Sequence, residues 1–119
     1  MPDVNLLVAM SWPEHPHYQL ATEWRKIHPP FCTCPITELG LLRVLISTGT
    51  TVALAEGQMA TVIKHRKALL PCDLSADVLR GKIHGHRQVT DSYLLEVARK
   101  NSTKLATFDG GIQGAELIR

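Results

Sequence analysis

Apolar and polar positions along the chain fall mostly into helical periods, which are separated by short apolar runs. In the stretch 91–100 the apolar residues are Leu94, Leu95, Val97 and Ala98. This spacing places them on one helix face, and the apolar run at 104–108 that follows is typical of a strand. After a very short first strand, the pattern predicts helices near residues 5–10, 16–27, 36–47, 52–68, 75–82 and 91–100, and strands near 31–34, 69–73, 104–108 and 116–118.

Alternation of strands and helices predicts an α/β fold in which helices cover both faces of a central parallel sheet. With 119 residues, 45% hydrophobic and 20% charged, the chain has the size and composition of one globular domain spanning 1–119. No apolar run reaches the roughly 20 residues of a membrane span, and no secretory signal is visible. Three cysteines without an export signal indicate reduced thiols. We therefore expect a cytoplasmic protein that has no membrane partner.

Four acidic residues stand where an apolar run meets a loop or a helix start: Asp3, Glu38, Asp91 and Asp109. A helix of about 10 residues covers roughly 15 Å and a strand of about 5 residues roughly 16 Å, so the chain returns Asp109 to the level of Asp91. In open α/β sheets, ligands bind beyond the carboxyl ends of the strands. The sequence therefore predicts that all four carboxylates gather at this edge.

Such a cluster of carboxylates requires compensating positive charge. Two carboxylates about 4 Å apart repel each other by roughly 4 kcal/mol at an effective dielectric constant near 20. Oxygen ligands favour hard ions such as Mg²⁺ or Mn²⁺, and a bound ion of this kind activates water for hydrolysis. Taken singly, three of these acids also have a structural interpretation: Asp91 and Glu38 suit the first turn of a helix, and Asp109 suits a turn before Gly110.

The net charge of +2 is small, but basic residues are concentrated in the runs 64–67 and 80–87. A basic rim beside an acidic pocket suits a polyanionic substrate such as RNA. Arg87 lies four residues before Asp91, although it also suits a solvated loop. Arg43, in an apolar helical run, is either a phosphate contact or a side chain that extends its charge to solvent. The candidate RNA-binding residues are Arg43, Lys64, Arg66, Lys67 and Arg87.

Four motifs occur along the chain in this order: Asp3-Val-Asn5, Thr37-Glu-Leu-Gly-Leu-Leu-Arg43, Gly85-His-Arg-Gln-Val-Thr-Asp91 and Leu105-Ala-Thr-Phe-Asp109. The ordered set resembles the PIN-domain ribonucleases, and more closely the VapC toxins of bacterial toxin–antitoxin systems. The resemblance implies a PIN-like three-layer α/β/α fold and a Mg²⁺- or Mn²⁺-dependent endoribonuclease, often a homodimer, that a small antitoxin inhibits. It implies that Asp3, Glu38, Asp91 and Asp109 are the catalytic and metal-binding residues, with Asn5 and Thr107 as supporting polar residues.

The chain departs from this pattern at its start. The family usually has several apolar strand residues before the first aspartate, whereas only Met1 and Pro2 precede Asp3 here. Either this strand is very short, or the natural start lies upstream of Met1.

Other functions fit the sequence less well. An aspartyl-phosphate phosphatase of the haloacid dehalogenase type needs a second aspartate where Asn5 stands. The closely spaced histidine and cysteine pairs at 15/17, 32/34 and 84/86 lack the spacings of zinc sites. The main alternative is a non-catalytic α/β binding module that acts through a protein partner.

Overall fold

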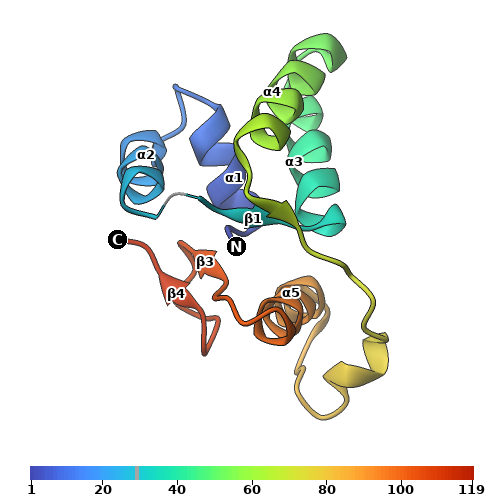
Figure 1. Ribbon diagram of the computed structural model, residues 1–119. Coiled ribbons are helices and arrows are strands. Elements are labelled where there is room, and N and C mark those ends of the chain that lie inside the picture. The colour runs from blue at the N-terminus through green and yellow to red at the C-terminus, as the bar shows by residue number, and fades with distance from the viewer. Residues whose placement is uncertain (29) are drawn as a thin grey trace.

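The computed structural model describes residues 1–28 and 30–119, and within them the chain alternates helices with short strands (Figure 1). The α-helices are α1 (Val4–Ser11), α2 (Tyr18–Ile27), α3 (Pro35–Ser47), α4 (Val52–His65) and α5 (Val89–Lys100). The strands are β1 (Cys32–Thr33), β2 (Ala68–Leu69), β3 (Ala106–Thr107) and β4 (Glu116–Leu117). Two short 3-10 helices, η1 (Ala76–Leu79) and η2 (His86–Gln88), precede α5.

All the strand pairs are parallel, as the sequence predicts. β1 pairs with β2 and β3 pairs with β4, while Pro2 forms a single parallel bridge to Ala106. Figure 1 shows α3 and α4 on one side of the β1–β2 pair and α5 on the other. The predicted α/β class is therefore confirmed, with helices on both sides of parallel strands.

The first strand is as short as the sequence allows, yet it is held firmly. The Met1 amino group donates to the Lys104 carbonyl at 2.6 Å, and the Met1 carbonyl accepts from the Ala106 amide at 2.8 Å. The Asp3 amide then donates to the Ala106 carbonyl at 2.9 Å. These bonds place Asp3 directly beside β3.

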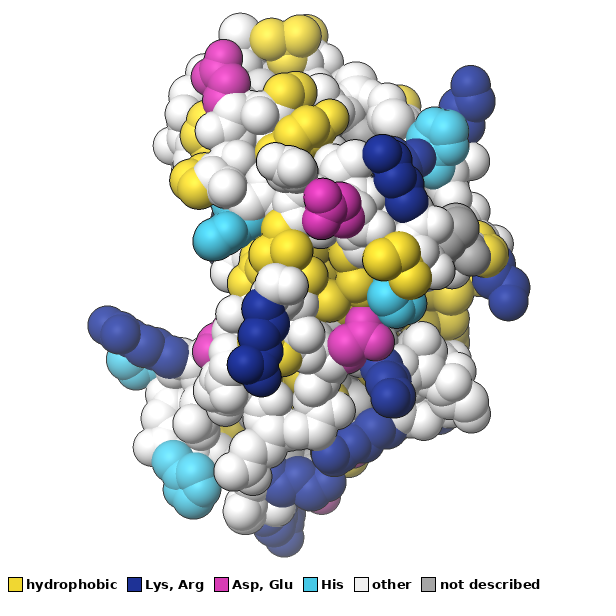
Figure 2. Space-filling model, turned by 90° about the vertical axis from the view of Figure 1, so that its left-hand side faces the viewer, with side chains coloured by type: hydrophobic (Ala, Val, Ile, Leu, Met, Phe, Trp, Pro, Cys, Tyr) yellow, Lys and Arg dark blue, Asp and Glu magenta, His cyan; other side chains and the backbone are white. Residues whose placement is uncertain are grey.

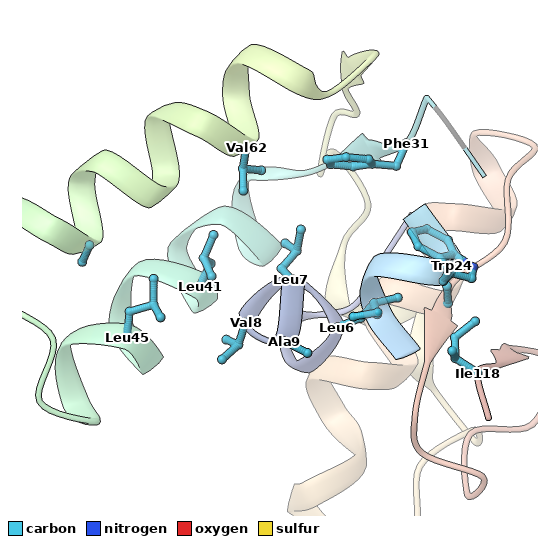
Figure 3. Packing of buried hydrophobic residues seen from close by; sticks show 13 residues of the cluster. Leu6, Leu7, Val8, Ala9, Trp24, Phe31, Leu41, Leu45, Val62 and Ile118 are labelled. Atoms are coloured by element: carbon cyan, nitrogen blue, oxygen red, sulfur yellow. The ribbon is translucent and has the colours of Figure 1, made fainter. Parts of the chain in front are cut away.

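The hydrophobic core lies on both sides of the strands. The larger cluster surrounds α1, whose Leu6 and Leu7 are fully buried against α2, α3 and α4 (Figure 3). A helix that is apolar on nearly all sides is expected to be buried in this way. The second cluster joins α5 to Met1 and Leu105. Because α1 begins one residue after Asp3, the packing of α1 also fixes Asp3.

Glycine is required where α3 crosses the start of α1. A Cβ atom at Gly40 would overlap the side chain of Val4. The close approach that this glycine permits brings the N-terminal part of α3, which carries Glu38, toward the segment that carries Asp3.

Three predicted boundaries are corrected by the structure. The helix predicted at 52–68 ends at His65, because the Lys67 amide donates to the Phe31 carbonyl at 2.7 Å and Ala68 then begins β2. The helix predicted at 91–100 begins at Val89 and follows Gln88 as its cap residue, so Asp91 lies in its first turn and is not its cap. The helix predicted at 75–82 is only the 3-10 turn η1.

No helix in the described part of the chain combines the length and apolar character that crossing a membrane requires.

Candidate metal and RNA site

Asp3 is the most buried acid of the predicted set, with 4% of its surface exposed. As the cap of α1, its Oδ1 accepts from the Leu6 amide at 2.8 Å, and its Oδ2 accepts from Thr107 Oγ1 at 2.5 Å. Burial raises the pKa of Asp3 above 3.8, and the hydrogen bonds from Thr107 and the Leu6 and Asn5 backbone oppose this effect. Asp3 therefore caps α1, and its burial makes the ionised form of its carboxylate less stable than it would be in water.

Thr107 links two of the predicted acids. Its side chain is 1% exposed, and its hydroxyl donates to Asp3 while accepting from the Asp109 amide at 3.0 Å. The Asp109 carboxylate in turn accepts from the Gly111 amide at 2.8 Å, which holds it in the turn after β3. The predicted supporting residue Thr107 thus sets the spacing between Asp3 and Asp109.

Asp91 completes a cluster of three aspartates. It lies in the first turn of α5 and is partly buried. Burial raises the pKa of Asp91, and the negative charges of Asp3 and Asp109 raise it further. The structure therefore brings Asp3, Asp91 and Asp109 close enough for their charges to interact, and we call these residues the aspartate cluster.

Glu38 is held differently. Its Oε2 accepts from Thr33 Oγ1 at 2.6 Å and forms an ion pair with the guanidinium of Arg66. Both partners are mostly buried, with 16% of the Glu38 and 20% of the Arg66 side chain exposed. Glu38 is not among the charges that raise the pKa of Asp3 or Asp91. The fourth predicted acid thus carries its own counter-ion.

The donor chemistry of the aspartate cluster suits a hard divalent ion. It offers only oxygen ligands, and two of its three acids have a raised pKa that a cation would relieve. In the described residues 1–28 and 30–119, no three His, Cys, Asp or Glu side chains are already arranged to hold a metal ion. The carboxylates therefore fit such an ion by chemical type and mutual charge, but their side chains would have to converge on it.

A cleft of about 710 Å³ opens beside the aspartate cluster. Asp91 and Asp109 line it together with basic residues from the loop before α5 and from α5 itself. These basic residues are Lys82, His84, Arg87 and Arg99. Lys82 and Arg99 both pair with Glu96, at 3.1 and 3.0 Å. Lys and Arg side chains gather in the lower part of the face in Figure 2, at the level of α5 in Figure 1.

The candidate RNA-binding residues are divided by the fold. Arg87 lines the cleft, whereas Arg66 is engaged with Glu38. Lys64, Lys67 and Arg43 are exposed, and none of the three lines the cleft. Asn5 is exposed in the first turn of α1 and acts on Asp3 through its backbone.

Three basic residues of the cleft, Lys82, His84 and Arg99, are not among the candidates that the sequence predicts. Lys82 and His84 belong to the basic run at 80–87. Arg99 lies eight residues after Asp91 on α5, a separation of about two helical turns that places both residues near one face. Helical spacing from Asp91 was the signal that would have identified Arg99.

The sequence of this chain is similar to those of known proteins. No protein-family model matches the chain. Ribonuclease VapC29 of Mycobacterium tuberculosis is 38% identical over 113 residues, covering 92% of this chain and 85% of the relative. Ribonuclease VapC38 of the same species is 36% identical over 121 residues, covering 92% and 84%. Ribonuclease VapC39, also of that species, is 32% identical over 122 residues, covering 92% and 88%.

These identities extend over nearly the whole chain and over more than four fifths of each relative. The chain therefore belongs to the VapC family of PIN-domain toxins.

Proposed function

We propose that this protein is a toxin endoribonuclease that cleaves cellular RNA with the help of Mg²⁺ or Mn²⁺. The observation that carries the proposal is the aspartate cluster, in which Asp3, Asp91 and Asp109 interact electrostatically beside a basic cleft. Carboxylates whose pKa is raised by burial and by neighbouring negative charge create a demand for positive charge. The VapC relatives are all named ribonucleases, which supports RNA as the substrate.

In this proposal each residue has a separate task. Asp3, Asp91 and Asp109 would hold the divalent ion; Asp91 and Asp109 line the cleft, and Asp3 is buried. Thr107 fixes Asp3 relative to Asp109 through its two hydrogen bonds. The ion, when bound, supplies an activated water and positive charge for the scissile phosphate. Glu38 is the fourth proposed ligand, and it must leave or share its Arg66 partner to take part.

The cleft supplies the binding surface for the RNA backbone. His84 lies in the segment before η2 and Arg87 lies within η2, and Asp91 follows in the first turn of α5. Phosphates bound by these side chains would lie beside the acids. Two further cleft cations, Lys82 and Arg99, are already paired with Glu96. Arg87 is therefore the strongest candidate for a direct phosphate contact.

RNA cleavage by the purified protein tests this function. We expect cleavage of total cellular RNA in Mg²⁺ or Mn²⁺, and we expect EDTA to stop it because the proposed ligands are all oxygen atoms. The Asp109→Asn variant, purified in parallel, controls for contaminating nuclease. Cleavage that continues undiminished in EDTA, and that is absent with the variant, would contradict metal-ion catalysis by this chain.

RNA binding measured at several salt concentrations tests which basic residues contact the RNA. Arg87→Gln is expected to weaken RNA binding and to reduce the slope of log affinity against log salt by up to about 1. Lys64→Gln removes one exposed positive charge outside the cleft and is the matched control, for which we expect a smaller change. If Lys64→Gln has the larger effect, the RNA path runs along the end of α4 and not through the cleft.

A protein partner also belongs to the proposal. The family assignment implies a small antitoxin, and we propose that the chain forms a homodimer. The exposed apolar side chains on α3 and α4 support a protein-covered surface. They are Leu39, Ile46, Val52, Leu54 and Ile63, of which Leu39 and Leu54 are 67% and 65% exposed.

A further inference from the structure

Arg66 is the one residue of the basic run 64–67 that the fold turns toward an acid of the proposed site. It caps the C-terminus of α4, and its amide donates to the Val62 carbonyl at 2.9 Å. On its other side the Lys67 amide bonds the Phe31 carbonyl, and Ala68 pairs with Cys32. The backbone of Arg66 is thus fixed between a helix end and a parallel strand pair.

Glu38 is fixed from the opposite side. It stands in the first turn of α3, and Thr33 of β1 donates to its Oε2. Arg66 engages the same oxygen. No hydrogen bond to Oε1 of Glu38 is found within residues 1–28 and 30–119. One oxygen is therefore held by two donors, while the other is free of them.

Glu38 and the aspartate cluster differ in the positive charge that lies next to them. Within residues 1–28 and 30–119, no ion pair to an acid of the aspartate cluster is found. Burial and neighbouring negative charge instead raise the pKa of Asp3 and Asp91. Glu38, in contrast, has a mostly buried arginine in contact. A positive charge at this position repels an incoming divalent ion and at the same time reduces the negative charge that Glu38 offers it.

We propose that Arg66 is a positioning residue that serves as an internal counter-ion of Glu38, so that a divalent ion must compete with Arg66 for this carboxylate. The proposal rests on the proposed metal-dependent function. In it, Arg66 lowers the affinity of the empty site for metal, and Thr33 keeps Glu38 in place when Arg66 is displaced. Arg66 would then limit occupancy of the site at low metal concentration.

Calorimetric titration with Mn²⁺ in the absence of RNA tests the proposal. Arg66→Gln is expected to bind Mn²⁺ at least about fivefold more tightly than the wild type, because a neighbouring positive charge is removed while Thr33 still holds Glu38. Arg66→Lys keeps the charge and should bind Mn²⁺ like the wild type. Lys67→Gln removes an adjacent, exposed charge and is the matched control, for which no change is expected.

A double variant shows whether the effect passes through Glu38. In a Glu38→Gln background, adding Arg66→Gln should no longer tighten Mn²⁺ binding. Persistent tightening there, unchanged or weaker binding by Arg66→Gln alone, or equal tightening by Lys67→Gln would each overturn the role of Arg66. If the wild type binds Mn²⁺ normally in those cases, the proposed function survives. A wild type that binds no Mn²⁺ would overturn both.

Discussion

Replacing Asp91 with asparagine is expected to slow RNA cleavage by at least about 100-fold, near 2.7 kcal/mol, without loss of the fold. Asp91 lines the cleft and interacts with both other acids of the cluster. Asparagine keeps the size of the side chain and one oxygen but removes the charge that the ion needs. Initial cleavage rates at saturating Mg²⁺, with circular dichroism to compare the folds, measure this effect.

The same variant should change stability in a defined direction with pH. Because the pKa of Asp91 is raised above 3.8, the folded state holds this proton more tightly than the unfolded state. Ionisation of Asp91 therefore reduces stability as pH rises above about 4. Without metal, Asp91→Asn should match the wild type in acid and equal or exceed its stability at neutral pH.

Asp73→Asn provides a control of opposite sign. A hydrogen bond from Lys100 lowers the pKa of Asp73, so its charge adds stability above 3.8 that is lost as pH falls. This variant should lose a little stability at neutral pH and retain full cleavage. An Asp91→Asn protein that is clearly less stable at neutral pH would instead show that Asp91 mainly supports the start of α5.

Expression of the wild-type chain alone is expected to arrest cell growth, and Asp109→Asn is expected to abolish the arrest. Asp109 lines the cleft and is tied to Asp3 through Thr107. Co-expression of a small antitoxin should relieve the arrest. An Arg or Lys of its C-terminal segment, for example, would pair with Asp91 or Asp109 in place of the metal charge. Growth curves after induction, with Asp73→Asn as the active control, measure these outcomes.

The contrary result is equally clear. If the wild-type and Asp109→Asn proteins are equally harmless while both are well expressed and folded, the proposal that this chain is a toxin is wrong. The non-catalytic binding module would then be the better description, with the exposed apolar residues of α3 and α4 as its contact surface.

Local sequence patterns predicted the parts of the fold that depend on local chemistry. Helical spacing located α5, the short apolar run located β3, and the chain lengths of the two returned Asp109 to the level of Asp91. Asp3 was predicted at the same place because it follows the first strand, and ligands bind beyond the carboxyl ends of parallel strands. Thr107 was assigned by resemblance, and its two hydrogen bonds give that assignment a physical basis.

The features that sequence did not predict depend on pairing between distant segments. The end of α4 at His65 follows from the pairing of Lys67 with Phe31, which no local propensity reveals. That pairing also turns Arg66 toward Glu38. Arg66 lies in a basic run that suits RNA binding, but in the folded protein it forms an ion pair with Glu38. The cleft likewise combines the loop before α5 with the turn after Asp109.

The most direct test of the central claim is Mn²⁺ binding to the metal-free protein, measured by calorimetry for the wild type and for Asp91→Asn and Asp109→Asn. The claim is that the aspartate cluster is a divalent-metal site. It predicts saturable binding by the wild type and at least about tenfold weaker binding by each variant, near 1.4 kcal/mol. Equal affinity in all three proteins, or no binding by a wild type that still cleaves RNA, would contradict it.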